Sequence, residues 1–522
     1  MAAQAPRRKP NFLVILADDM GYSDAGCYGG DIDTPNLDGL AARGLRFTHG
    51  YSTARCGPSR SGILTGHYAQ QTAADVMTPG KVPDWTRFAP HHLKTAGYRA
   101  YHSGKWHIRF KPQDAVGFDH SYTLLDQNSF FAPRASQLDG RQIPPIKKEE
   151  GFYATTAIGG HAVRFLKEHA RDHANDPFYF YLAFTAPHFP LHALQEDIDK
   201  YKDRFAEGWD EARAKRYARM RKMGLVNCKL SKMEPGMWPD WNLASGDLNT
   251  RAGAGEVSRA VPWKTLTPEQ KKFQRTKMAI HAAMIDRMDQ EIGRVTSQLK
   301  AMNALDDTVI VFVSDNGASA EQMIRGDGHD PAAPPGSAMS HLCLGPGWSS
   351  AANTPFRLHK SWVHEGGISS PWIVSWPNGI ADKGKLRRTP CHLVDIVPTM
   401  MDLAGVDARG ALPSQAPPLS GRSLTPAFAR DTVLPRDYIS FHHNRNRAIR
   451  VGDWKLASIG EKGPWELYDM AKDRSEQTDL AAKEPARVAS LATKWQEAED
   501  GFIRAREASQ STGMPRMTGR GA

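Results

Sequence analysis

The chain has 522 residues, of which 40% are hydrophobic, 9% aromatic and 24% charged. This composition is typical of a globular protein and excludes a fibrous or largely disordered chain. No apolar run approaches the ~18 residues of a membrane-spanning helix. The net charge of +10 could attract nucleic acid, another polyanion or small anions. Spread over so long a chain, it equally fits a basic surface that is only solvated by water.

Strand and helix patterns alternate along most of the chain. The first predicted strand, Phe12–Ala17, is apolar throughout, as is usual for a parallel strand covered on both faces. A helix is predicted over Asn36–Arg46, where leucines recur at roughly helical spacing. Further strands are predicted at Arg99–His102, Phe178–Phe184, Thr308–Val313 and Trp372–Trp376, and further helices at Thr156–Lys167 and Thr267–Lys300.

The helix that begins at Thr267 has the clearest start signal. Thr267 is suited to cap it, Pro268 to occupy its first position, and Gln270 to complete a capping box. Strands that alternate with such helices predict an α/β fold with a large, mostly parallel sheet sandwiched by helices. Ligands of these sheets bind beyond the carboxyl ends of the strands, so residues that directly follow strands are candidates for a site.

Two stretches interrupt the alternation. Residues 201–265 contain a basic run at 213–222, and residues 326–350 are rich in Gly, Pro and Ser. Long loops of this kind act as lids, substrate contacts or flexible spacers.

After residue 430 the pattern changes to short antiparallel strands and one helix. The strands are predicted at Asn446–Val451, Trp454–Ser458 and Trp465–Tyr468, and the helix from about Pro485 to Glu507. We therefore predict a large α/β domain at 11–430, a smaller C-terminal α+β subdomain with a short antiparallel sheet at 431–508, and a disordered tail at 509–522.

The five cysteines are few, odd in number and widely separated, without a CxxC pair. They argue against a disulfide framework and against a cysteine-based zinc site. The basic residues 7–9 precede only six apolar residues, which is too short for a signal peptide. As the chain stands we expect a cytoplasmic protein; a periplasmic or secreted one is the alternative if an export signal was removed.

Cys56 begins the string Cys-Gly-Pro-Ser-Arg-Ser-Gly-Ile-Leu-Thr-Gly, which leads into a helical stretch. A cysteine there lies at a helix N-terminus, where the helix dipole favours anions. Taken alone, it is either a nucleophilic thiolate of low pKa or a small buried cysteine.

The pattern C-x-P-S-R-x-x-x-L-T-G resembles the signature of the sulfatase family. In that family the cysteine is oxidised after translation to formylglycine. The resemblance covers about residues 11–485 and is closest in style to arylsulfatase-like members. It implies the fold of the alkaline phosphatase superfamily, in which the larger domain is catalytic, with Cys56 as the modified residue and Arg60 beside it.

Two acidic pairs directly follow predicted strands: Asp18-Asp19 and Asp315-Asn316. Adjacent carboxylates repel one another unless a cation lies between them. Three carboxylates and an amide oxygen suit Ca²⁺ or Mg²⁺ rather than zinc. Read alone, each pair is more often a turn or a helix cap. The resemblance implies that these four residues, with residue 56, bind a divalent metal, Ca²⁺ by preference and Mg²⁺ as the alternative.

Three further segments match the family. The resemblance implies that Lys105 of Gly-Lys-Trp-His binds a sulfate oxygen and that His107 helps the covalent adduct break down. His188 of Ala-Pro-His-Phe-Pro is implied to contact the sulfate and to protonate the leaving alcohol, and Lys360 of Asn-Thr-Pro-Phe-Arg-Leu-His-Lys is implied to be a second sulfate-binding lysine. Arg60 also contributes charge to the developing sulfuryl oxygens.

The implied reaction is hydrolysis of a sulfate monoester with release of inorganic sulfate. One hydroxyl of a formylglycine hydrate attacks sulfur beside the divalent metal, and the second expels sulfate and regenerates the aldehyde. An aryl sulfate and a sulfated carbohydrate both fit the core site, and residues His442–Arg445 are a candidate substrate subsite. A formylglycine-generating enzyme is the implied maturation partner, and no nucleic acid or membrane partner is expected.

Two other functions remain open at this point. A phosphonate or phosphate ester hydrolase of the same superfamily would use similar residues for a tetrahedral oxyanion. A basic polyanion-binding protein with a degenerate site is a different class, supported only by the basic run at 213–222.

Overall fold

The computed structural model describes residues 9–147, 150–325 and 329–508. The tail expected at 509–522 lies outside these ranges. Within them, the largest sheet has ten strands in the order β11-β2-β10-β9-β1-β8-β4-β5-β6-β7. Its strands are β1 (Asn11–Ala17), β2 (Gly44–Phe47), β4 (Arg99–Lys105), β5 (His120–Leu124), β6 (Ser136–Leu138), β7 (Arg141–Ile143), β8 (Phe178–Ala183), β9 (Thr308–Ser314), β10 (Trp372–Ser375) and β11 (Lys385–Arg387).

The centre of this sheet is parallel. β1 lies between β8 and β9 and pairs with both in parallel, and β4 pairs in parallel with β8 and β5. β10 is antiparallel to β9 and β2, and β6 and β7 extend the other edge in antiparallel pairing. The predicted α/β architecture with a mostly parallel sheet is therefore confirmed.

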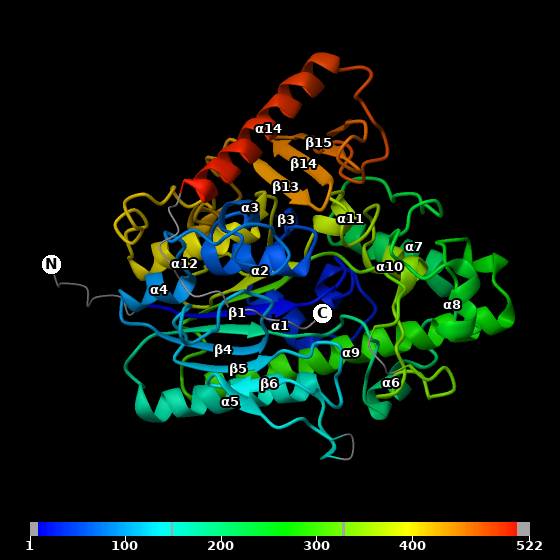
Figure 1. The fold of residues 1–522 in the computed structure, drawn as a ribbon, viewed down its shortest axis with the longest axis horizontal. Helices are drawn as coiled ribbons and strands as arrows, with labels where there is room; N and C mark the ends of the chain where they lie inside the picture. Colours follow the sequence, from blue (N-terminus) through cyan, green and yellow to red (C-terminus); the bar gives the residue numbers. More distant parts are fainter. Residues whose placement is uncertain (1–8, 148–149, 326–328, 509–522) are drawn as a thin grey trace.

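Helices cover both faces of the sheet (Figure 1). Leu13 and Ile15 of β1 belong to a core cluster on one face, whereas Phe12, Val14 and Leu16 belong to the cluster on the other, because successive strand residues point to opposite faces. The helices α1 (Pro35–Ala42), α5 (Ala154–Asp172) and α9 (Pro268–Ala301) contribute to the first cluster. The helices α2 (Cys56–Thr65), α4 (Ala89–Lys94) and α12 (Ile396–Ala404) contribute to the second.

The helix predicted over Asn36–Arg46 is correct only in its first part. α1 ends at Ala42, and Leu45 lies in strand β2, paired with Val374 of β10. A side chain on Gly44 would meet the carbonyl oxygen of Val374 at 2.1 Å, so this close approach of two strands requires glycine. A four-residue strand is too short to show its own period, and Leu45 continued the spacing of the helix before it.

The other predicted elements of the large domain are confirmed, with small shifts at their ends. The strand predicted at Thr308–Val313 extends one residue further, to Ser314, and the strand predicted at Arg99–His102 continues to Lys105. The side chain of Thr267 accepts a hydrogen bond from the amide of Gln270 and the capping box forms as predicted.

The two interrupting stretches are partly helical. They contain α7 (Gly208–Lys222), α8 (Ser245–Arg251) and α10 (Gly345–Ala352). The basic run lies on α7, and it is not a uniformly exposed face: Arg213 and Arg216 are buried, and Arg216 forms ion pairs with Asp24 at 2.8 Å and Asp31 at 2.6 Å. These two arginines are therefore not available to a polyanion.

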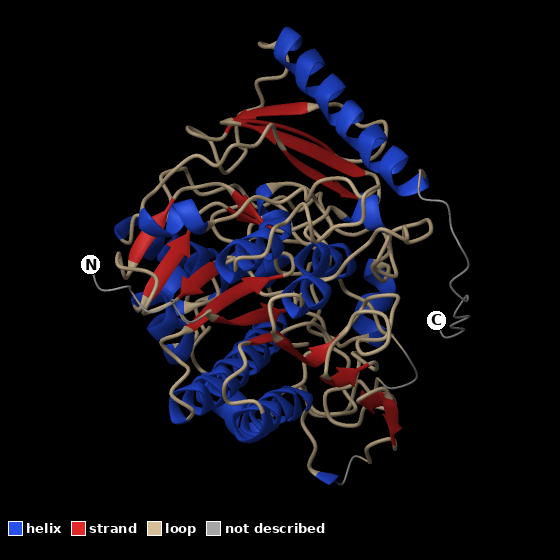
Figure 2. Ribbon diagram, turned by 90° about the vertical axis from the view of Figure 1, so that its left-hand side faces the viewer, coloured by secondary structure: helices blue, strands red, loops and turns tan. Residues whose placement is uncertain are grey.

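The C-terminal part forms a four-stranded antiparallel sheet with a long helix across it (Figure 2). Its elements are β13 (Ile439–His443), β14 (Asn446–Val451), β15 (Trp454–Ser458), β16 (Glu466–Asp469) and α14 (Pro485–Glu507). The helix and three strands were predicted, while β13 was missed. The boundary placed at residue 430 stays a prediction.

The remaining short elements connect these units. They are β3 (Gly50–Tyr51), α3 (Ala69–Thr72), α6 (Gln195–Tyr201), α11 (Glu365–Ile368), β12 (Cys391–His392) and α13 (Thr425–Ala429). All five cysteines are buried and none forms a disulfide. In the part of the chain that the structure describes, no helix combines the length and apolarity needed to cross a bilayer.

Candidate active site

Three strands from the centre of the sheet, β9, β1 and β4, deliver the predicted polar residues to one edge of it. Asp18 and Asp19 follow β1, Asp315 and Asn316 follow β9, and Lys105 ends β4. The parallel pairing of β1 with β9 puts their carboxyl ends side by side, so the backbone amide of Asp19 donates to Oδ1 of Asp315 at 3.2 Å. The two acidic pairs, far apart in the sequence, therefore form one cluster.

Cys56 is the first residue of α2 and is buried. Its Sγ and one carboxylate oxygen each of Asp18 and Asp315 lie within 4.8 Å of one another. Ser59, on the first turn of the same helix, donates to the carbonyl oxygen of Asp315 at 2.5 Å. This bond ties the start of α2 to the end of β9, and it holds Cys56 at the acidic cluster.

Arg60 joins the helix to three strand ends. Its guanidinium is fully buried, and Nη2 lies 3.3 Å from Oδ2 of Asp18 and 3.2 Å from Oδ2 of Asp315. Nη1 donates to the carbonyl oxygen of Lys105 at 2.9 Å. The Nζ of Lys105 in turn lies 2.5 Å from Oδ2 of Asp18. Two buried cations, Arg60 and Lys105, thus flank the carboxylate of Asp18. Buried charges are stable only when charges of the opposite sign pair with them in this way.

Two buried oxygens in the cluster fit a metal ion. Within the described residues, Oδ1 of Asp18 and Oδ1 of Asn316 have no hydrogen-bond partner. The amide nitrogen of Asn316 donates to Asp19 at 2.7 Å and to the carbonyl oxygen of Gly317 at 2.9 Å, which fixes its orientation and leaves its oxygen free. Buried polar atoms rarely lack partners, and carboxylate and amide oxygens are the ligands that Ca²⁺ and Mg²⁺ prefer.

The carboxylates of the cluster have opposite pKa shifts. Burial opposes ionisation of Asp18, but Lys105, His188 and Arg60 together bring its pKa to about 2. Burial, followed by the charge of Asp18, raises the pKa of Asp315 well above its ordinary value. The protein's own cations therefore favour the ionised form of Asp18 more than that of Asp315. A divalent cation between them would favour ionisation of both.

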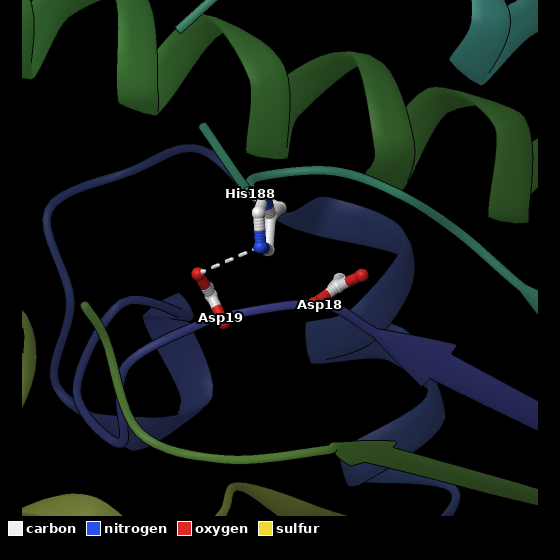
Figure 3. Close-up of side chains that lie close together, drawn as sticks. All are labelled: Asp18, Asp19 and His188. Carbon is white, nitrogen blue, oxygen red and sulfur yellow. Dashed lines mark ion pairs between the residues drawn. The ribbon is translucent and has the colours of Figure 1, made fainter. Parts of the chain in front are cut away.

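His188 and Lys360 approach the cluster from the side of Asp19. The Nε2 of His188 lies 3.7 Å from Oδ2 of Asp19 (Figure 3), and Nδ1 donates to the carbonyl oxygen of Phe189 at 2.5 Å. Burial and the neighbouring charge of Lys360 hold the pKa of His188 well below its ordinary value. The Nζ of Lys360 lies 2.8 Å from Asp19, and although burial opposes its charge, Asp19 raises its pKa.

His107 lies at the margin of this group. It follows β4 with a backbone φ of 61°, a conformation rare for a side-chain-bearing residue. Its Nε2 lies 3.2 Å from the side-chain nitrogen of Gln127, and its Nδ1 has no partner within the described residues. Burial, Lys105 and Arg60 hold its pKa well below the ordinary value, which favours a neutral imidazole that can accept a proton.

Sequence patterns missed two residues that the structure adds to this site. Gln127 contacts His107, and Glu321 is buried against Lys360 at 3.3 Å and Arg55 at 3.2 Å. Glu321 also accepts a hydrogen bond from the indole of Trp241 at 2.9 Å. Neither residue stands in a recognisable string, and their only signal is the fold that brings them to charged partners.

The Sulfatase family model matches residues 10–406. A second model, of the C-terminal part of N-sulphoglucosamine sulphohydrolase, matches residues 356–498. An arylsulfatase of Klebsiella aerogenes is 30% identical, over 81% of this chain and 93% of its own length. An N-acetylglucosamine-6-O-sulfatase of Bacteroides thetaiotaomicron is 26% identical, over 91% of this chain and 83% of its own length.

The fold is also similar to solved structures. One of them, a protein in complex with its substrate D-glucosamine-2-N,6-O-disulfate, superposes with a TM-score of 0.65 at 22% identity and covers 95% of this chain and 98% of its own. At this identity the likeness concerns the fold. It agrees with the ten-stranded sheet and the small antiparallel sheet found within the described residues.

Proposed function

Because the chain belongs to the sulfatase family, we propose that it cleaves a sulfate monoester at Cys56 with a formylglycine and a divalent metal ion. The observation that carries the proposal is the convergence of Cys56, Asp18 and Asp315 within 4.8 Å. The family membership supports sulfate ester hydrolysis itself. The nucleophile and the metal are supported by the identity and burial of the residues at this point.

Formylglycine at position 56 would supply, as its hydrate, the hydroxyl nucleophile that a thiol cannot replace. The metal would supply positive charge that lowers the pKa of a bound hydroxyl and stabilises sulfuryl oxygens. Asp18, Asp19, Asp315 and Asn316 would hold that ion, and Asp18 and Asn316 offer the two oxygens without partners. Oxygen donors suit both Ca²⁺ and Mg²⁺, and we propose Ca²⁺, on the resemblance to the family alone, with Mg²⁺ as the alternative.

The chain's own cations would bind and orient the sulfuryl group. Arg60, Lys105 and Lys360 are buried and already in contact with the acidic cluster. Positive charges held in place in this way need no rearrangement as negative charge develops in the transition state, and such preorganisation is usually the largest contribution to catalysis. This preorganisation supports their assignment as sulfate-binding residues.

His188 and His107 would transfer protons in different halves of the reaction: His188 when the alcohol leaves, and His107 when the sulfate leaves. In the free site the pKa of His188 is low, but a bound sulfate ester brings negative charge that favours its protonated form. Its Nε2 can then give a proton to the leaving alcohol oxygen. His107, whose Nε2 accepts a hydrogen bond from Gln127 and so carries the lone pair of the neutral ring, is the proposed base for the second half of the reaction.

A phosphate or phosphonate ester is the competing substrate class. The test is a comparison of turnover on an aryl sulfate and on matched phosphate mono- and diesters, with protein co-produced with a formylglycine-generating enzyme. The proposal predicts the highest kcat/KM on the sulfate ester. A higher kcat/KM on a phosphate ester would reassign the enzyme.

The substrate is proposed to be a sulfated saccharide rather than a simple aryl sulfate. The similar Bacteroides protein is an N-acetylglucosamine-6-O-sulfatase, and the match to the C-terminal part of N-sulphoglucosamine sulphohydrolase points the same way. An aryl sulfate presents the same sulfuryl group to the core residues, so it serves as a substrate that needs no sugar recognition.

A further inference from the structure

A cleft of about 980 Å³ is lined by residues that are close in sequence to the proposed catalytic ones. Pro58, two residues after Cys56, and Ser361, next to Lys360, both line it. The rest of its lining comes from the inserted stretch 237–241, the turn between β13 and β14, and the end of α14. Its volume fits a ligand of one or two rings, since binding pockets usually measure about 300 to 1,000 Å³. The alcohol part of a substrate whose sulfate lies at Cys56 would enter this space.

Tryptophans of the inserted stretch provide an aromatic surface in the cleft. Trp238 and Trp241 are 37% and 41% exposed, among the few large apolar side chains that the described residues leave so open. Trp241 is fixed in place, because its indole nitrogen donates to Glu321 at 2.9 Å and Glu321 lies 3.3 Å from Lys360. A stationary ring of this kind offers a flat face to a ligand at low cost in conformational entropy.

The β13–β14 turn provides polar groups that lack partners. His443 is 5% exposed, yet its Nε2 has no hydrogen-bond partner within the described residues. Burial, and then the charges of Arg55, His442 and Lys360, lower its pKa well below the ordinary value. Arg445 is exposed on the same turn and forms no ion pair within the part of the chain described.

The turn itself is anchored rather than loose. Asn446 donates to the carbonyl oxygen of Ser361 at 2.7 Å, and Gln70 donates to the carbonyl oxygen of His442 at 2.9 Å. The ring of His442 is held by Glu499 at 2.9 Å. A buried polar atom without a partner, such as Nε2 of His443, is costly to a folded protein unless a ligand satisfies it.

We propose that this cleft binds the sugar ring of the substrate, with Trp241 stacking on the ring and His443 and Arg445 hydrogen-bonding to its hydroxyls. The inference rests on the proposed function and names the residues that select its substrate. A hydroxyl-bearing ring fits better than an aryl ring, because an aryl ring would leave the buried Nε2 of His443 without a partner. Sites built around hydrogen bonds discriminate strongly against ligands that lack the matching groups.

The test compares two substrates in each variant. The substrates are 4-nitrophenyl sulfate, which has no sugar, and the best of a panel of monosulfated monosaccharides that includes N-acetylglucosamine 6-sulfate. Arg445→Ala and His443→Phe should each lower kcat/KM on the saccharide by about 10-fold or more, mainly through KM, since each removes a hydrogen bond to the substrate. On the aryl sulfate the change should stay within about twofold, because no hydroxyl is there to lose.

Two further variants complete the comparison. Arg141→Ala is the control. It removes an exposed arginine on β7, at the far edge of the sheet, and should leave kcat/KM on both substrates unchanged. Trp241→Ala should raise KM for the saccharide, whereas Trp241→Phe should keep most of the affinity because a stacking ring remains.

The outcomes separate this inference from the function on which it rests. Selective loss on the saccharide supports the subsite. Equal loss on both substrates, no loss in any cleft variant, or turnover of the aryl sulfate with no saccharide in the panel accepted would overturn it while leaving the sulfatase assignment intact. Failure of the wild type on every sulfate ester would refute the proposed function and the subsite together.

Discussion

The Nζ of Lys360 lies 3.3 Å from the carboxylate of Glu321, and both side chains are buried to about 1% exposure. Lys360 also contacts Asp19 at 2.8 Å. Glu321 is therefore a second buried carboxylate, besides Asp19, that balances the charge of a proposed sulfate-binding lysine. It acts as a positioning residue, since its contacts are Lys360, Arg55, Ser319 and Trp241.

Glu321→Gln should keep the shape of this contact and remove its charge. We expect kcat on an aryl sulfate to fall, with KM changing less, because Lys360 loses the partner that fixes its position. The free energy of unfolding should fall by about 1–3 kcal/mol, the usual cost of weakening a buried hydrogen bond to a charged group. Glu321→Asp should restore part of kcat. An unchanged kcat in the glutamine variant would show that Lys360 does not depend on Glu321.

The proposed metal site can be tested at the amide oxygen of Asn316, which has no hydrogen-bond partner within the described residues. Asn316→Ala removes this oxygen and the donor to Asp19, so the purified variant should hold less Ca²⁺ per chain than the wild type. Because a ligand that binds only the folded state stabilises it, added Ca²⁺ should raise the Tm of the wild type more than that of the variant. Equal metal content, measured by elemental analysis, and equal Tm responses would argue that Asn316 is not a ligand.

The role of His188 as a proton donor can be separated from a role in binding. His188→Gln should lower kcat little on a sulfate ester with an acidic leaving group such as 4-nitrophenol. On an ester of a weakly acidic alcohol the loss should be far larger, about 10²–10⁴-fold, because that leaving group needs the proton. The dependence of log kcat on leaving-group pKa should therefore steepen in the variant. The same slope in both enzymes would assign the proton to another residue.

The contact between the loop after β1 and α7 predicts a pH dependence of stability. Asp24 lies 2.8 Å from Arg216 and 3.0 Å from His281, and although burial opposes its ionisation, these partners lower its pKa from 3.8 to about 2. A folded-state pKa below the unfolded value means that ionisation of Asp24 stabilises the folded protein by about 2 kcal/mol above pH ~4, and that this contribution is lost as the pH falls toward about 2.

Asp24→Asn should therefore lower the Tm near neutral pH, and the difference from the wild type should stay constant down to about pH 4 and narrow as the pH falls from about 4 to about 2. Thermal unfolding of both proteins across this range measures it. Glu168→Gln on the exposed face of α5 is a matched control, since its ion pair with Arg164 is solvent-exposed and contributes little. A difference that stays constant with pH would contradict the assigned pKa shift.

Much of the central site could be predicted because it follows strand ends. Asp18, Lys105 and Asp315 lie at the ends of strands whose apolar runs were visible in the sequence, and the carboxyl-end rule places such residues together. Cys56 was predicted at a helix N-terminus and begins α2. Their proposed chemical roles rest on the resemblance to the family, and the structure adds that their charged groups are buried and in contact.

Other features depend on long-range packing that no local pattern carries. Glu321 lies 39 residues before Lys360 and meets it only through the fold. β2 was hidden because Leu45 continued a helical spacing, and its pairing with β10 joins residues more than 300 positions apart. In the sequence the basic run on α7 was the only support for a polyanion-binding function, but Arg216 is buried because Asp24 and Asp31 compensate its charge.

Removal of the proposed nucleophile tests the site without disturbing its surroundings much. Cys56→Ala deletes one buried sulfur at the start of α2, so the protein should fold and retain its Tm within a few degrees. Sulfate release should fall to background in the same preparation. Near-wild-type turnover in this variant would mean that another residue attacks sulfur.

The most direct measurement is mass spectrometry of the peptide that contains residue 56, from the same preparation in which sulfatase activity is measured. We predict that active protein carries an aldehyde at this position, and that the modified fraction rises with specific activity when a formylglycine-generating enzyme is co-produced. Fully active protein with an intact Cys56 thiol would contradict the proposed mechanism.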